Sequence, residues 1–317
     1  MNWKRKALLQ RVCARLPLGR ELVYYGLQRC AGSLRQLPDP WWYLERCREL
    51  VSAIQAAGVS VENARIMEVG TGWVAQTPIN FFLCGANSIV TFDLHRYLIP
   101  RFVVDSVKVL ASDKNRVVRM LGDFVGSGKV GERLDLISRC ASCDEILRTA
   151  RISYRAPADA AHTDLPDHSI NIHISNNVFE HVPPAALKQI LLEANRVLMP
   201  TGVAIHRFGP SDHFAEDQSI LPINFLQYRQ EEWDRLADNQ FAYHNRLRGS
   251  DYKNLYDAAG HQIVEWEPTI HPPSLTALKN GFPLAPEFQG KSWEDLSTVL
   301  LRVVSRPGDP TERPLAG

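Results

Sequence analysis

The sequence predicts a doubly wound α/β fold, because short apolar segments alternate along the chain with segments of helical periodicity. Seven apolar segments have the length of buried strands, and several lead into a segment whose apolar residues recur three or four positions apart. This alternation is typical of a mostly parallel sheet that helices cover on both faces. The expected strands are residues 65–69, 88–93, 152–154, 170–175, 203–208, 262–266 and 298–304.

The expected helices begin and end at recognisable residues. Residues 41–57 have apolar side chains at helical spacing and stop at Gly58. Thr77 followed by Pro78 is typical of an N-cap and a first helical position, and predicts a short helix from there through residue 84. Two more helices are expected over residues 185–198 and 252–259.

Three stretches exceed what this core needs. We expect residues 1–60 to form an N-terminal helical cap and residues 61–306 to form the core. The core is expected to carry insertions at about 98–150 and 209–250, and the first of these has the apolar spacing of helices that lie over the site. Residues 307–317 are expected to be a flexible tail.

Charge and cysteine content narrow the class of protein. A net charge of +1 argues against a dedicated nucleic-acid binder. No apolar run approaches the ~20 residues of a membrane span, and six scattered cysteines are typical of reduced thiols in a cytoplasm. Residues 1–38 nevertheless hold eight Lys and Arg residues against one Glu. They are either the solvated face of a packed helix or an interfacial helix that docks on the inner face of a membrane.

The strongest motif follows the first expected strand. Glu68, Gly70 and Gly72 stand at a strand-to-helix turn, where glycines allow a ligand to approach the backbone closely. Asp93 ends the next strand, where a carboxylate can accept hydrogen bonds from ribose hydroxyls. The loop also fits a dinucleotide pattern, so a nicotinamide-dependent oxidoreductase is an alternative. Glu68 favours a ligand with an ammonium group, because a pyrophosphate would meet its negative charge.

These motifs, with Asp159 and with Glu180 and His181 after the fourth strand, resemble a class I S-adenosylmethionine-dependent methyltransferase over residues 64–208. The resemblance implies a Rossmann-like, mostly parallel seven-stranded sheet with helical additions, whose last strand inserts antiparallel. It implies S-adenosylmethionine as the cofactor, with the methionine end near Glu68, the ribose at Asp93 and the adenine at Asp159, for which Asp164 is the alternative. The implied cofactor residues are Glu68, Gly70, Thr71, Gly72, Trp73, Asp93, Leu94, Asp159, Ala160, Ser175 and Asn176.

A hydroxyl acceptor benefits from a general base with a pKa near neutrality, for which histidine is the usual choice. The candidates at the carboxyl ends of the fourth and fifth strands are His181, His206, Asp212 and His213. Each also has a structural interpretation. His181 can cap the following helix, His206 can pack in the core, and Asp212 with His213 can form a solvated turn. Their spacing is not that of a recognised metal site, so no metal is predicted.

The acceptor is less defined than the cofactor. Residues 209–214 and 245–248 are similar to those of methyltransferases that act on bacterial glycans and surface polysaccharides. We therefore expect methylation of an oxygen in a small molecule, sugar or polysaccharide precursor. A nucleic-acid base is disfavoured, because Asn176-Asn-Val-Phe replaces the Asn/Asp-Pro-Pro-aromatic loop of such enzymes. A non-catalytic cofactor-binding protein and a membrane-docked interaction protein remain as alternatives.

Overall fold

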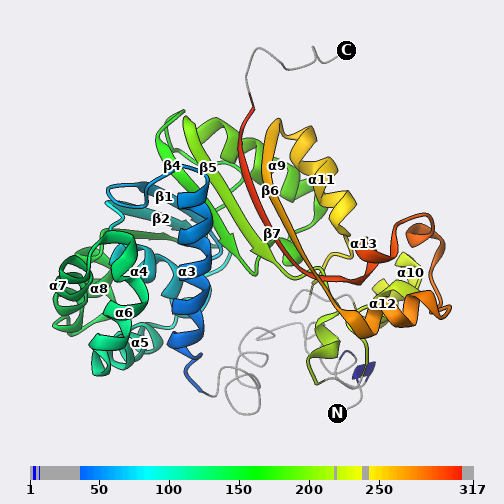
Figure 1. Ribbon diagram of the computed structural model, residues 1–317, viewed down its shortest axis with the longest axis horizontal. Helices are drawn as coiled ribbons and strands as arrows, with labels where there is room; N and C mark the ends of the chain where they lie inside the picture. The colour runs from blue at the N-terminus through cyan, green and yellow to red at the C-terminus, as the bar shows by residue number, and fades with distance from the viewer. Residues whose placement is uncertain (1–2, 5–6, 8–35, 218–219, 238–242, 309–317) are drawn as a thin grey trace.

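The computed structural model describes residues 3–4, 7, 36–217, 220–237 and 243–308 (Figure 1). Most of the basic N-terminal segment and the last nine residues lie outside the described residues. The predictions of a membrane-docking helix and of a flexible tail therefore remain predictions.

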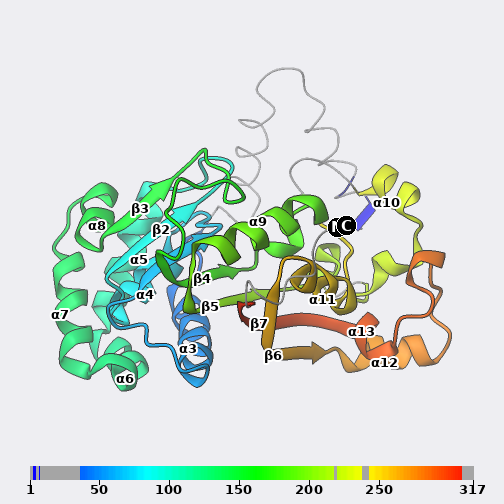
Figure 2. The ribbon, with the colours of Figure 1, turned by 90° about the horizontal axis from the view of Figure 1, so that it is seen from above.

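Seven strands form one sheet in the order β3-β2-β1-β4-β5-β7-β6 (Figures 1 and 2). Strands β1 to β5 pair in parallel, whereas β7 lies antiparallel between β5 and β6. This arrangement confirms the predicted fold class and the antiparallel insertion of the last strand. The strands are β1 Arg65–Val69, β2 Ser88–Phe92, β3 Ile152–Arg155, β4 Ile170–Asn176, β5 Leu198–Phe208, β6 His261–Ile270 and β7 Thr298–Pro307.

Helices cover both faces of this sheet. Successive residues of a strand point to opposite faces, so each strand contributes side chains to both helical layers. On β1, Ile66 belongs to the hydrophobic cluster on the side of α3 (Pro40–Ala56) and α4 (Gln76–Leu83). Its neighbour Met67 belongs to the cluster on the side of α9 (Pro184–Val197) and α11 (Gly249–Ala258). Figure 2 shows α3 on one side of the sheet and α9 with α11 on the other.

The long insertion after β2 is helical, as expected, and its helices share the core of α3 and α4. The first turn of α5 reaches the loop after β1, because Phe102 is buried against Val74 and Trp73 packs beside them. The other helices extend this core away from that loop, at the left of Figure 1. The helices are α5 Pro100–Ser112, α6 Lys114–Val125, α7 Ser127–Ser138 and α8 Cys143–Thr149.

A third hydrophobic cluster lies beyond the carboxyl end of β5, in the right-hand part of Figure 1. It joins the insertion after β5 to residues 271–297, between β6 and β7, which are largely helical. Trp3 also belongs to this cluster and stacks on Trp233, with ring centroids 6.0 Å apart. The Trp3 ring centroid lies 5.6 Å from that of Phe214 and 6.0 Å from that of Tyr228. The elements of the cluster are η3 His213–Asp217, η4 Asn224–Gln227, α10 Gln230–Leu236, α12 Pro272–Lys279, η5 Pro286–Phe288 and α13 Trp293–Ser297.

One local prediction is wrong. Thr77 is not the N-cap of α4, because the helix begins at Gln76 behind Ala75, which has a left-handed φ of 48°. The Thr77 hydroxyl instead forms a hydrogen bond with the Glu68 side chain. A side-chain partner from the neighbouring strand thus outweighs the local capping preference.

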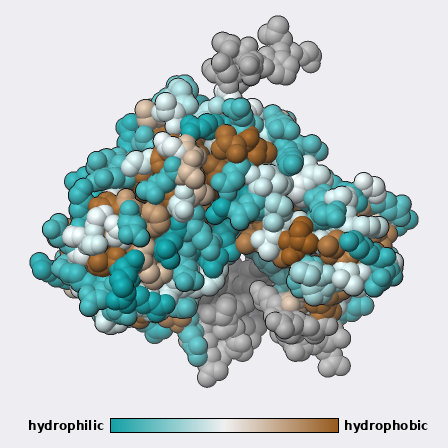
Figure 3. Space-filling view, viewed as in Figure 1, coloured by the Kyte–Doolittle hydropathy of each residue, from teal (hydrophilic) through white to brown (hydrophobic). Residues whose placement is uncertain are grey.

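Among the described residues, none of the helices is both long and apolar enough to cross a membrane. The face seen in Figure 3 is largely hydrophilic, with its hydrophobic residues in separate patches.

Candidate active site

The candidate site lies at the edge of the sheet where the parallel strands end. Ligands of open α/β sheets bind at this edge, outside the carboxyl ends of the strands. The loop after β1 begins at Gly70, Asp93 follows β2, Asn176 ends β4 and Gly209 follows β5. Sequence reasoning placed its cofactor residues on the first three of these segments, and the topology brings all three to one edge.

The glycine loop after β1 is packed on one side and open on the other. Gly70 has a φ of 85°, and a Cβ there would lie 2.3 Å from Val178 Cγ2, at the start of the segment after β4. Gly72 has a φ of 67°, and a Cβ there would have nothing within 4 Å among the described residues. The loop is therefore pressed against the end of β4 and leaves free space beside Gly72, as a closely approaching ligand requires.

Glu68 supports this loop from below. Its side chain is 1 % exposed, and Thr91 Oγ1 donates a hydrogen bond to Glu68 Oε2 at 2.5 Å. Thr91 also forms a hydrogen bond with the Thr71 hydroxyl. Burial, together with the charge of Asp93, raises the pKa of Glu68 to about 8, although hydrogen bonds from Thr91 and Thr77 oppose the rise. The carboxyl group therefore contacts the loop through Thr91.

Asp93 lies at the end of β2 and is 6 % exposed. The Gly72 amide donates a hydrogen bond to Asp93 Oδ2 at 3.2 Å, so this carboxylate is held beside the open part of the loop. Burial raises its pKa to about 7, against the opposing effect of hydrogen bonds from Tyr154, Gly72 and Thr71. The next residue, Leu94, is 65 % exposed.

Trp73 stands where many class I methyltransferases, the family that the sequence resembles, have a third glycine. It is half-buried and packs edge-on against Tyr97, with ring centroids 5.2 Å apart. Its carbonyl accepts a hydrogen bond from the Ile99 amide at 3.0 Å. Trp73 thus fixes the loop after β1 to the segment that leads into α5.

The segment after β3 lies beside Asp93, because the Ala158 amide donates a hydrogen bond to the Asp93 carbonyl at 2.9 Å. Asp159 follows with an exposed side chain, and Ala160 is buried. Partial burial would raise the pKa of Asp159, but hydrogen bonds from the Ala161 amide and His162 outweigh it and lower the pKa. The alternative, Asp164, forms an exposed ion pair with Arg155.

Ser175 and Asn176 end β4 in the middle of this edge. Ser175 is fully buried, and its Oγ has no hydrogen-bond partner within the described part of the chain. It pairs in register with Val69 of β1 on one side and with His206 of β5 on the other. Asn176 is half-buried and accepts a hydrogen bond from Arg207 at 3.4 Å.

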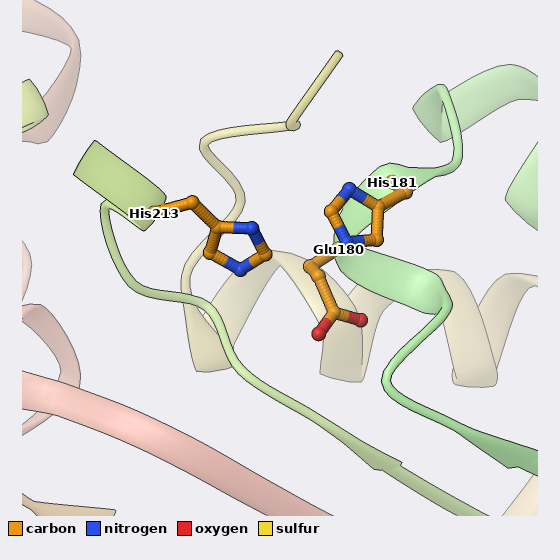
Figure 4. A group of neighbouring side chains, drawn as sticks. All are labelled: Glu180, His181 and His213. Atoms are coloured by element: carbon orange, nitrogen blue, oxygen red, sulfur yellow. The ribbon is translucent and has the colours of Figure 1, made fainter. Parts of the chain in front are cut away.

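Two of the predicted catalytic residues lie together after β4 and β5 (Figure 4). His181 ends η2 (Phe179–His181), and the centroid of its ring is 4.8 Å from that of His213. His181 Nδ1 lies 3.0 Å from the Tyr243 carbonyl oxygen. Since a carbonyl only accepts, Nδ1 is the donor and the Nε2 atom of the neutral ring carries the free lone pair. Asn245 anchors η2, because its side chain donates to the carbonyls of Phe179 and Val182 at 2.7 and 2.9 Å.

The other two predicted catalytic residues have structural contacts. Asp212 is 3 % exposed; its Oδ1 accepts from the Phe214 amide at 2.8 Å and its Oδ2 from Asn224 at 2.9 Å. His206 is fully buried in the sheet, with its Nε2 2.9 Å from His173 Nδ1. Burial and the neighbouring His173 lower the pKa of His206 well below its usual value. The core interpretation of His206 therefore fits the structure better than a catalytic one.

Sequence reasoning missed two members of this cluster. Glu180 was noted as part of the family's Glu-His pair but given no role, and its carboxylate lies beside the rings of His181 and His213 (Figure 4). His244 stacks on His213 with ring centroids 4.4 Å apart and an interplanar angle of 30°. Glu180 could have been found from its place at a strand end, whereas only the fold brings His244 to the cluster.

Comparisons with known proteins give a family match over part of the chain. A methyltransferase-domain family matches residues 132–206, which contain β3, β4 and most of β5. The solved structure of an S-adenosylmethionine-dependent methyltransferase from Clostridium acetobutylicum is similar at 8 % identity, covering 91 % of this chain and 99 % of the other, with a TM-score of 0.45. One from Mesorhizobium loti is 15 % identical over 83 % of this chain and 99 % of the other, with a TM-score of 0.42.

A search of curated proteins gives no significant match. The likeness to methyltransferases consists of the match over residues 132–206, the sheet order with an antiparallel β7, and the glycine loop beside Asp93. The chain therefore has the Rossmann-like methyltransferase fold, and its residues 132–206 match a methyltransferase domain.

Proposed function

We propose that this enzyme methylates an oxygen of a hydroxyl-bearing small molecule, sugar or polysaccharide precursor. The observation that carries the proposal is the pair of imidazole rings, His181 and His213, at the ends of β4 and β5. The pair is next to the cofactor loop, since Gly70 is packed against Val178, three residues before His181. An imidazole here can accept the proton of a hydroxyl group.

The residues at the sheet edge fit S-adenosylmethionine. The space beside Gly72 admits a ligand against the backbone, and Asp93 lies next to it with a carboxylate for the ribose hydroxyls. Asp159 and Ala160 follow the adjacent strand on the adenine side. The unpartnered Ser175 Oγ offers a further polar contact in the middle of the edge.

The charge of the site also suits this cofactor. Two buried carboxyl groups, Glu68 and Asp93, have pKa values raised mainly by burial. A ligand that brings a sulfonium and an ammonium group favours their ionised forms, whereas a pyrophosphate opposes them. Glu68 acts on the methionine end by orienting Thr91 and the loop, because its carboxyl group is almost fully buried.

The acceptor half supports a polar ligand with a sugar. A cavity of about 370 Å³ adjoins the histidine cluster, because His244 and Asn245 line it. Aromatic rings and charged groups share its wall, a combination that suits the apolar faces and hydroxyl groups of sugars. The other lining residues include Trp233, Tyr243, Asp234, Arg246 and Lys291.

The reaction is an in-line displacement in which the cofactor supplies a methyl group activated by sulfonium. The acceptor oxygen forms the new bond to the methyl carbon, the carbon–sulfur bond breaks, and S-adenosylhomocysteine leaves. In the absence of a bound cation, the hydroxyl proton goes to the Nε2 atom of a neutral imidazole. Most of the protein's contribution is the positioning of the two reactants.

The first experiment is a calorimetric titration of the protein with S-adenosylmethionine, S-adenosylhomocysteine and NAD. We expect micromolar binding of the first two, no binding of NAD, and at least a tenfold loss of affinity in Asp93→Ala. Asp135→Ala is the matched control, because this carboxylate lies on α7, is partly exposed and is paired with Lys114. Unchanged affinity in Asp93→Ala would refute the cofactor placement.

Acceptors are then screened with methyl-labelled cofactor against sugars, sugar nucleotides and hydroxylated small molecules. Mass spectrometry with fragmentation locates the methyl group on the product. A methyl group found on nitrogen or carbon instead of oxygen would overturn the proposed acceptor chemistry and leave the cofactor site intact.

A further inference from the structure

We propose that Glu180, His181 and His213 bind one divalent transition-metal cation at the acceptor end of the site. The binding site stands on its own geometry, and the role of the ion in activating the acceptor hydroxyl rests on the proposed function.

The three side chains converge from two segments of the chain. Each offers one ligand atom, and these atoms all lie within 4.8 Å of one another. In Figure 4, Glu180 and His181 come from η2 and His213 from the loop after β5, on opposite sides of a shared space. Ligands of a single ion at ~2.1 Å lie roughly 3–4 Å apart. Side-chain rotations that move the ligand atoms by about an ångström are thus enough to bring all three within bonding distance of one ion.

Glu180 gives the strongest indication of a cation site. It is 2 % exposed, and its Oε1 accepts a hydrogen bond from the Gly209 amide at 3.1 Å. Its Oε2 is buried without a hydrogen-bond partner among the described residues. A buried carboxylate is costly unless a positive charge or several donors compensate it. A cation between Glu180 and the two imidazoles supplies that compensation.

His181 is oriented as a metal ligand. The Tyr243 carbonyl accepts from Nδ1 at 3.0 Å, which leaves the lone pair on Nε2. A hydrogen bond from the second ring nitrogen to a carbonyl is the usual support of a ligating histidine. His244 packs against the His213 ring and restricts the orientation of that ring by contact. The histidines of the cluster are therefore held by their neighbours before an ion binds.

The donor set indicates the class of ion. Two imidazole nitrogens and one carboxylate oxygen suit zinc, manganese, iron or cobalt better than calcium or magnesium, which prefer oxygen donors. Three protein ligands leave coordination positions for the acceptor. When bound, the ion lowers the pKa of an acceptor hydroxyl that coordinates it. With the ion bound, both imidazoles are ligands, so this lowered pKa replaces the general base of the proposed function: the proton leaves to solvent, and the oxygen attacks the methyl carbon as before.

The test measures the ion directly. Protein treated with a chelator and dialysed is titrated with Co²⁺, followed by calorimetry and by visible absorption. We expect one Co²⁺ per chain with micromolar or tighter affinity, and d–d bands that indicate imidazole and carboxylate ligands. The affinity should fall at least tenfold in Glu180→Gln, His213→Ala and His181→Ala.

The control is His168→Asn, at the opposite edge of the sheet, where His168 Nδ1 contacts the Leu198 carbonyl at 2.9 Å. It should bind Co²⁺ like the original protein. His181 is exposed, so His181→Ala preserves the fold if Glu180→Gln does not. Absence of stoichiometric Co²⁺, or equal affinity in all variants, overturns the site.

S-adenosylmethionine binding by the metal-free protein is measured in parallel. Retained cofactor binding without Co²⁺ binding would refute the metal site and leave the proposed function standing. Co²⁺ bound by the three ligands, in a protein that methylates nitrogen or carbon, would support the site and refute the proposed function.

Discussion

Replacement of Glu68 by glutamine should change how the stability of the protein depends on pH. Burial raises the pKa of Glu68 to about 8, against 4.5 for the unperturbed side chain. The folded protein therefore prefers the neutral carboxyl group, which glutamine imitates in shape and in its lack of charge. As the pH rises above 4.5, the unfolded chain loses this proton first, and the free energy of unfolding falls until the folded protein also loses it, near pH 8.

The size of the effect follows from the two pKa values. One unit of pKa corresponds to about 1.36 kcal/mol, so the full difference is about 5 kcal/mol. About 3.5 kcal/mol of this falls between pH 5 and pH 8. The original protein should thus lose about 3.5 kcal/mol relative to Glu68→Gln over that interval.

Urea unfolding followed by circular dichroism, without cofactor, measures this difference at steps of half a pH unit. Glu45→Gln is the control, since Glu45 is exposed on α3 and should give a curve parallel to that of the original protein. Parallel curves for Glu68→Gln and the original protein would show that Glu68 is ionised in the fold, and would refute the argument that its environment is desolvating.

Two further predictions concern stability. Arg248→Lys should lower the free energy of unfolding, measured in urea titrations, by about 3 kcal/mol. The fully buried guanidinium donates hydrogen bonds to the carbonyls of Pro210, Leu296 and Thr298, and a lysine cannot replace them. A loss below about 1 kcal/mol would contradict this account. Gly70→Ala should cost at least about 1 kcal/mol more than Gly281→Ala, because both glycines have a φ near 85° but only the Cβ at Gly70 meets a neighbour, Val178. Equal losses of stability in thermal unfolding would mean that Val178 moves aside freely.

The sheet, and the edge at which the proposed cofactor residues meet, could be predicted because local signals encode them. Alternating apolar segments mark the strands, and Gly70 with Gly72 occupies positions whose positive φ favours glycine. Parallel strands then bring the residues after β1, β2 and β4 to one edge whatever the helices between them do. The sequence therefore located this edge without any knowledge of contacts.

The acceptor half could not be predicted in the same way, because long-range contacts determine it. His206 and Asp212 look like His213 in the sequence, yet strand register buries the first and a hydrogen bond from Asn224 engages the second. His244 reaches the cluster only through the packing of the segment before α11. The helices between β6 and β7 were missed because they bury their apolar faces in a small separate cluster, outside the pattern of the sheet.

The two halves of the site are drawn from different parts of the chain. The proposed cofactor edge comes from residues 65–181, whereas the wall of the proposed acceptor cavity comes from residues 184–291. Arg248 connects this later segment to the sheet, because its guanidinium donates hydrogen bonds to the carbonyl of Pro210, just after β5, and to that of Thr298, at the start of β7. This arginine therefore ties the wall of the cavity to the point where β5 ends and β7 begins, so a change in either one is transmitted to the other.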